Sequence, residues 1–166
     1  MIRKTQMPSE TEPPTQTATE RHQMLVQWND TARAYPRDKC IHQLFEEQVE
    51  RTPESVALVW RDQHLTYRAL NQRANRLAHH LRALGVGPEM AVGVCLDRSP
   101  NLVVTLLGIL KAGGVYVALD PAYPLERLQF MLADSRAELV IGHESFVSQF
   151  GPAGTPRLVL LEAIPQ

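Results

Sequence analysis

The chain has 166 residues, of which 44% are hydrophobic and 21% charged, and its formal net charge is -1. This length suits one domain with a real core rather than two of ordinary size. The composition is that of a globular rather than a disordered protein. The balanced charge excludes a surface devoted to nucleic acid, which needs a clear basic excess.

The sequence predicts a cytoplasmic protein. Cys40 and Cys95 have neither the spacing of metal ligands nor that of a disulfide framework, which favours a reducing compartment. No apolar segment follows Arg3 and Lys4, so a secretory signal is not expected. The longest uncharged apolar run, residues 102–110, is far shorter than the ~20 residues that cross a bilayer.

Three parts follow one another along the chain. Residues 1–23 combine prolines with Ser, Thr, Glu and Gln and have little to bury, so they are predicted to be a disordered tail. Residues 24–39 include Trp28 and Tyr35 and are predicted to form an extended linker arm that docks its aromatic side chains on a neighbouring surface. Residues 40–166 form the globular part.

The first half of the globular part is predicted to contain two helices and a hairpin. Helical spacing of apolar residues indicates a helix over 40–51 that ends before Pro53, and its His42 is interpreted as a half-buried histidine rather than a ligand. Residues 56–60 and 64–67 indicate a hairpin with a three-residue loop. Thr66 is the expected N-cap of a helix that ends at Gly85. The apolar stripe of that helix comprises Leu70, Ala74, Leu77, Ala78, Leu81 and Leu84.

The outer face of this second helix is basic. A phosphate site is one interpretation, but a solvated helix face is favoured by the balanced net charge. The adjacent His79 and His80 point in different directions on a helix and suit a shared metal poorly. The residues of this face are Arg73, Arg76, His79, His80 and Arg82.

The second half predicts alternating strands and helices. Residues 91–96 suit an interior parallel strand, and Ser99 with Pro100 begins a helix that runs through residues 101–112. Because this helix is apolar nearly all round, it should be buried between layers or against another domain. The strand predicted at 115–119 is apolar on both faces, so both should be covered. A helix over 125–132, strands over 138–141 and 157–161, and a loop over 151–156 complete an α/β fold with a mostly parallel sheet.

Two charged residues lie where a ligand site could form. Lys111 ends the apolar helix, where a cation is favoured by the helix dipole, and this role is preferred to a catalytic one. Asp120 follows a strand at its carboxyl end, where ligands of α/β proteins bind, but Asp-Pro is also a common turn opener. The sequence has no phosphate-binding glycine loop, nucleophile elbow or zinc-binding helix motif.

The segment from Leu110 to Pro124, LKAGGVYVALDPAYP, followed by Glu126 and Arg127, resembles the second core motif of the adenylation domains of nonribosomal peptide synthetases. Residues 65–70 resemble the first core motif, and the arm with the first helix resembles the approach to such a domain. The resemblance spans roughly residues 25–142. Two departures are Ala69, where the family usually has glutamate, and Ala118, where it usually has proline.

The resemblance implies part of the N-terminal subdomain of an adenylate-forming enzyme. Such domains use ATP and Mg to convert an amino acid into an aminoacyl adenylate, which then loads the phosphopantetheine thiol of a carrier domain. Their phosphate loop, specificity pocket and catalytic lysine lie beyond the second core motif. No catalytic, cofactor-binding or metal-binding residue is therefore assigned, and the chain alone is predicted to be inactive. Its expected partners are the remainder of the domain and, through it, a carrier domain.

Three alternatives stay open. The chain could derive from an acyl-CoA or fatty acyl-AMP ligase, although the arm and the Tyr-Pro-x-Glu-Arg pattern at 123–127 favour the peptide synthetases. It could be a non-catalytic α/β module that docks to a synthetase through the apolar helix 101–112. It could also be one half of a split enzyme.

Overall fold

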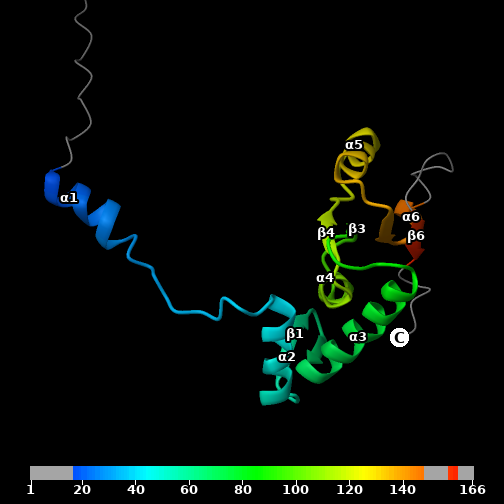
Figure 1. Cartoon of the computed structure of the whole chain (residues 1–166), viewed down its shortest axis with the longest axis horizontal. Helices are drawn as coiled ribbons and strands as arrows, with labels where there is room; N and C mark the ends of the chain where they lie inside the picture. Colours follow the sequence, from blue (N-terminus) through cyan, green and yellow to red (C-terminus); the bar gives the residue numbers. More distant parts are fainter. Residues whose placement is uncertain (1–16, 148–156, 161–166) are drawn as a thin grey trace, which may run out of the picture. The chain divides into compact units, whose positions relative to one another are not determined.

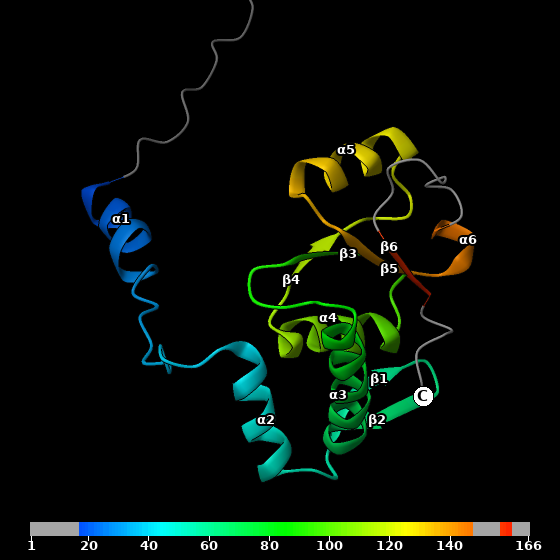
Figure 2. The same ribbon diagram turned by 45° about the vertical axis from the view of Figure 1, so that its right-hand side comes forward.

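The computed structural model describes residues 17–147 and 157–160. The chain divides into two compact units, residues 1–38 and 39–166, each of which is described by itself. Figures 1 and 2 label most of the helices and strands. The predicted loop 151–156 and most of the predicted disordered tail, residues 1–16, lie outside the described residues.

The first unit contains the short helix α1 (Ala18–His22), continued by the π-helix η1 (Gln23–Gln27). Thr17 and Glu20 form a capping box: the Thr17 N–H donates to the Glu20 carboxylate (2.8 Å), and the Glu20 N–H donates to the Thr17 hydroxyl (3.2 Å). The Thr17 N–H and the Thr17 hydroxyl (2.9 Å) both donate to the Glu20 carboxylate and lower its pKa. The prediction that disorder extends to residue 23 is therefore wrong for 18–23, because the Thr-x-x-Glu pattern caps a helix there.

The predicted arm, residues 24–39, is not extended throughout, because residues 24–27 belong to the helix η1. Its large side chains are mostly exposed within their own unit. Trp28 is 65% exposed, and Tyr35 is exposed as well, with the Arg37 guanidinium 5.4 Å from its ring centre. Docking of these aromatics on a neighbouring surface stays a prediction.

The second unit begins with helix α2 (Ile41–Arg51), which has the predicted extent. None of its residues is fully buried. Ile41 is 72% exposed, whereas the apolar residues Leu44, Phe45 and Val49 are half-buried. The centre of the Phe45 ring lies 5.8 Å from that of Tyr67, and Phe45 also packs against the larger core cluster. The ion pair described below adds a further contact of α2.

Strands β1 (Val56–Trp60) and β2 (Gln63–Thr66) form the expected antiparallel hairpin. The loop is shorter than predicted, because Gln63 already pairs with Trp60 and leaves only Arg61 and Asp62 between the strands. Arg61 adopts a positive φ of 51°, which a tight turn requires. Helix α3 (Tyr67–Ala83) then begins at the predicted N-cap, with the Thr66 hydroxyl accepting from the Ala69 N–H.

The main sheet is parallel, with the strand order β4-β3-β5-β6. Its strands are β3 (Ala91–Cys95), β4 (Val115–Ala118), β5 (Leu139–Gly142) and β6 (Arg157–Leu160). They are connected by helices α4 (Pro100–Ala112), α5 (Leu125–Ser135) and α6 (Glu144–Val147). Strand β3 is interior, as predicted, and β4 lies at one end of the order.

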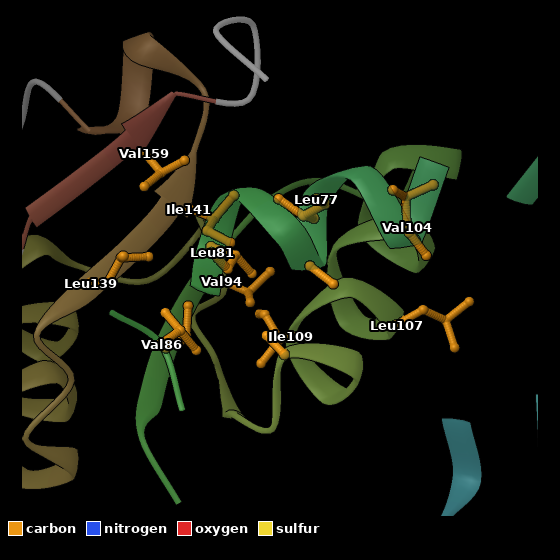
Figure 3. Close-up of a cluster of buried hydrophobic side chains, with 14 of the residues drawn as sticks. Leu77, Leu81, Val86, Val94, Val104, Leu107, Ile109, Leu139, Ile141 and Val159 are labelled. Atoms are coloured by element: carbon orange, nitrogen blue, oxygen red, sulfur yellow. The ribbon is translucent and has the colours of Figure 1, made fainter. Parts of the chain in front are cut away.

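Helices cover both faces of this sheet, as Figure 2 shows, with α5 on one side and α3 and α4 on the other. Successive residues of a strand point to opposite faces of the sheet, so the core consists of two clusters. Val92, Val94 and Ile141 pack with α3 and α4. Val140 and Leu119 pack with α5. Figure 3 shows the larger cluster, in which Leu77 and Leu81 of α3 meet the core side chains of α4 and the sheet.

Helix α4 has the caps that the sequence predicts. The Ser99 hydroxyl accepts from the Leu102 N–H, Pro100 occupies the first turn, and Gly113 ends the helix with a φ of 94°. No residue of α4 is exposed, so the predicted burial is confirmed. The Thr105 side chain is fully buried, and its hydroxyl has no hydrogen-bond partner among the described residues.

We expect Thr105→Val to raise the free energy of unfolding by about 1 kcal/mol, because it removes an unpaired buried hydroxyl while keeping the branched shape. Urea unfolding of the 166-residue chain measures this change. The same substitution at Thr66 is the control, and we expect it to lower the free energy of unfolding by about 1 kcal/mol because the N-cap is lost. A loss of stability in Thr105→Val would contradict the prediction.

The prediction that both faces of the strand at 115–119 are covered is only half right. Val117 is half-buried and Leu119 fully buried against α5, whereas Val115, Tyr116 and Ala118 are exposed. Tyr116 and Ala118 pair with Val92 and Val94 of β3 and so point to the α3–α4 side, but these helices do not reach across the edge strand. The sequence pattern predicts that both faces of the strand are buried, but it does not identify the residues that bury them.

Candidate functional site

The polypeptide leaves neighbouring strands β3 and β4 toward opposite faces of the sheet. The chain after β3 continues into α4 on one face, and the chain after β4 continues into α5 on the other. Where two adjacent parallel strands diverge in this way, a crevice opens at their carboxyl ends, and ligands of α/β proteins bind there. The carboxyl ends of β3 and β4 therefore define the first place to look for a site.

A groove of about 850 Å³ lies at this position. We call it the β3–β4 groove. Its lining comes from the hairpin, both strand ends, α4 and α5, and comprises Trp60, Arg61, Val94, Leu96, Asp97, Arg98, Leu102, Leu106, Tyr116, Ala118, Leu119, Asp120, Pro121, Tyr123, Arg127 and Met131. Its volume lies within the range of small-molecule sites.

The polar side chains of the groove are largely engaged in local structure. The Asp120 carboxylate accepts from the Ala122 N–H (2.9 Å), which confirms its role as a turn opener. The Arg127 guanidinium lies 4.4 Å from the ring centre of Tyr123, and that of Arg61 lies 5.7 Å from the Trp60 ring. No nucleophile with an adjacent general base occurs among the described residues that line it.

Cys95, at the end of β3, is the nearest thiol to this crevice, and its side chain is expected to be unreactive. Burial, reinforced by the negative charges of Asp97 and Asp120, raises its pKa to about 11. A thiol with this pKa stays protonated at neutral pH and is a poor nucleophile.

We therefore expect iodoacetamide at pH 8 to alkylate Cys40, which is exposed, and to leave Cys95 unmodified until urea unfolds the chain. Because the folded-state pKa is raised above its ordinary value of 9.0, the thiol also contributes stability that falls as pH rises from about 9 toward about 11. Peptide mass spectrometry reads the modification. Rapid alkylation of Cys95 in the folded chain would contradict the assignment.

Lys111 lies away from the groove in an ion pair. Its ammonium is hydrogen-bonded and ion-paired to Glu46 of α2, and its side chain is only 4% exposed, against 46% for that of Glu46. The ammonium also lies 6.0 Å from the centre of the Phe45 ring. This geometry supports the structural role that the sequence favours, but the main partner is a carboxylate 65 residues away rather than the helix dipole.

A second cavity, of about 310 Å³, lies between α2, α3 and α4 and borders this ion pair. His42, His79 and Arg82 line it, and the Arg82 guanidinium donates to the Lys111 carbonyl at the end of α4. His42 is half-buried, as predicted, and the basic face of α3 is exposed to solvent or half-buried. Among residues 17–147 and 157–160, no three His, Cys, Asp or Glu side chains gather in a way that could hold a metal. In the same residues, no helix has the length and apolar character that crossing a membrane requires.

The family model of the AMP-binding enzymes matches residues 45–161, which include the whole main sheet and both helical layers. The chain belongs to the AMP-binding enzyme family. Within this family it is similar to nonribosomal peptide synthetases. It is 56% identical over 122 residues to tyrocidine synthase 3 from Brevibacillus parabrevis, and 47% identical over 130 residues to bacitracin synthase 3 from Bacillus licheniformis.

These matches cover 74% and 78% of this chain but only 2% of each relative. The chain thus spans a small part of the length of the curated synthetases, and that part is a portion of an adenylation domain.

Solved structures agree with this placement. The AMPPNP-bound nonribosomal peptide synthetase FmoA3 superposes with a TM-score of 0.72 at 29% identity, over 82% of this chain and 15% of that one. The N-terminal subdomain of Klebsiella oxytoca NpsA, in complex with 3-hydroxyanthranilyl-AMSN, gives a TM-score of 0.69 at 25% identity, over 76% of this chain and 32% of that one. The predicted fold, part of an adenylation-domain N-terminal subdomain, is confirmed.

Proposed function

We propose that this chain is the N-terminal portion of an adenylation domain whose intact form activates an amino acid with ATP. The amino-acid carboxylate attacks the α-phosphorus of ATP, pyrophosphate leaves, and an aminoacyl adenylate forms. The acyl group then passes to the phosphopantetheine thiol of a carrier domain, with release of AMP. The observation that carries this proposal is the 56% identity to tyrocidine synthase 3 over most of the chain.

The contribution of these residues to that reaction is architectural. The first core motif supplies the Thr66 cap of α3, and the second supplies the end of α4, strand β4 and the start of α5. Lys111 serves an ion pair and Asp120 serves a turn, which supports an architectural role for both motifs. The 166 residues alone are therefore expected to lack the reaction.

The test is amino-acid-dependent exchange between ATP and labelled pyrophosphate. We expect no exchange above background by the isolated 166-residue chain with any of the common amino acids. We expect clear exchange by a chimera in which the chain replaces the matching segment of a tyrocidine synthase 3 adenylation domain. Exchange by the isolated chain would overturn the assignment of an architectural role. A folded chimera without amino-acid-dependent exchange would contradict the proposed function.

A further inference from the structure

The β3–β4 groove has a wall of exposed apolar residues on an edge strand. Tyr116 is 43% exposed and Ala118 is exposed, although both point to the face of the sheet that α3 and α4 cover further along. Leu102 and Leu106 of α4, on the other side of the groove, are only half-buried. Parallel sheets are normally covered on both faces, so this strip is incomplete as it stands.

The rim of the groove carries charges of both signs. Arg61, Arg98 and Arg127 stand near Asp97 and Asp120, so the excess of positive charge is small. Two of these arginines already stack on aromatic rings of the rim. A mixed rim around an apolar strip suits a polypeptide with polar and apolar side chains better than a small anion, which needs convergent unpaired donors.

The similarity to solved structures indicates where such a polypeptide comes from. The matched region amounts to 32% of the N-terminal subdomain of NpsA, so about two thirds of such a subdomain has no counterpart in this chain. We propose that the β3–β4 groove is an internal interface of the adenylation domain, covered by a segment of the remaining subdomain that packs apolar side chains against Tyr116, Leu102 and Leu106. This inference rests on the proposed function, and it excludes the groove as a ligand site or as a surface for a separate protein.

The experiment compares the isolated chain with the tyrocidine synthase 3 chimera by hydroxyl-radical footprinting and peptide mass spectrometry. No substitution is needed, because the probe oxidises Tyr116 directly. We expect Tyr116 to be oxidised readily in the isolated chain and about tenfold or more slowly in the chimera. Phe130, which is 68% exposed on α5 outside the groove, reports reagent access in the isolated chain.

A pair of substitutions gives a second readout. Tyr116→Glu should leave the melting temperature of the isolated chain nearly unchanged, because the side chain is partly solvated there, and lower that of the chimera by several degrees. Phe130→Glu is the matched control for placing a carboxylate on an exposed aromatic position. Equal oxidation of Tyr116 in both proteins, with no selective effect of Tyr116→Glu in the chimera, would overturn the inference and leave the groove open to an external ligand.

Pyrophosphate exchange by the chimera separates this inference from the proposed function. An active chimera with an accessible Tyr116 refutes the interface and keeps the function. A chimera that protects Tyr116 but exchanges no pyrophosphate with any amino acid keeps the interface and refutes the function.

Discussion

Glu46→Gln is expected to lower the free energy of unfolding of the chain by about 2–3 kcal/mol, somewhat less than breaking a fully buried ion pair, because Glu46 is half-exposed. The substitution leaves the Lys111 ammonium, whose side chain is 4% exposed, without its carboxylate partner. The opposite substitution, Lys111→Met, should cost about 1 kcal/mol or less, because Glu46 is half-exposed and water can solvate it. The asymmetry follows from the unequal burial of the two partners.

Urea unfolding of both single variants and of the double variant measures this asymmetry and the coupling between the residues. The exposed pair of Arg68 and Glu54 (2.7 Å) provides the control, since Glu54→Gln should change stability by less than about 1 kcal/mol. Equal costs for Glu46→Gln and Lys111→Met would show that the lysine is not desolvated in the folded chain.

The second large effect is expected at Gly108, where α4 packs against α3. A Cβ at this position would lie 2.8 Å from both Cγ and Cδ2 of Leu77 and 3.0 Å from its Cβ. Gly108→Ala should therefore lower the free energy of unfolding by about 1–2 kcal/mol, because overpacking outweighs the better helix propensity of alanine.

Gly87→Ala is the matched control, because a Cβ there meets no atom within 4 Å, and its effect should be close to zero. Combining Gly108→Ala with Leu77→Ala should cost less than the sum of the single changes, since the added methyl group enters the space that the leucine leaves. Additive costs in this double variant would place the strain elsewhere than at Leu77.

The elements could be predicted from sequence where local chemistry decides them. Thr66, the Ser99-Pro100 pair and Gly113 fix helix ends through their own hydrogen bonds and backbone angles, and each lies where the sequence predicts. Helix α1 escaped prediction although its capping box is local, because the composition of the surrounding tail outweighed that short signal. The turn at Asp120 forms as the Asp-Pro pattern predicts, because such a turn depends on neighbouring residues alone.

Other features depend on residues far apart in the chain and could not be predicted. The alternation at 115–119 shows that both sides of the strand are apolar, but the exposure of Tyr116 depends on how far α4 reaches across the sheet. The partner of Lys111 is Glu46, and no helical or strand periodicity relates positions 65 residues apart. The β3–β4 groove likewise arises only when the hairpin, two strands and two helices converge.

The position of β3 between β4 and β5 also affects the order in which the chain can fold during its synthesis. Val92 of β3 pairs with Leu139 of β5, which is made much later. At ordinary rates of synthesis this separation corresponds to roughly 2–10 s, during which the edge of β3 that later pairs with β5 stays unpaired. The α3–α4 pair is complete well before that time and can shield the Val92 and Val94 face of β3, so the order of synthesis favours assembly of that helical layer first.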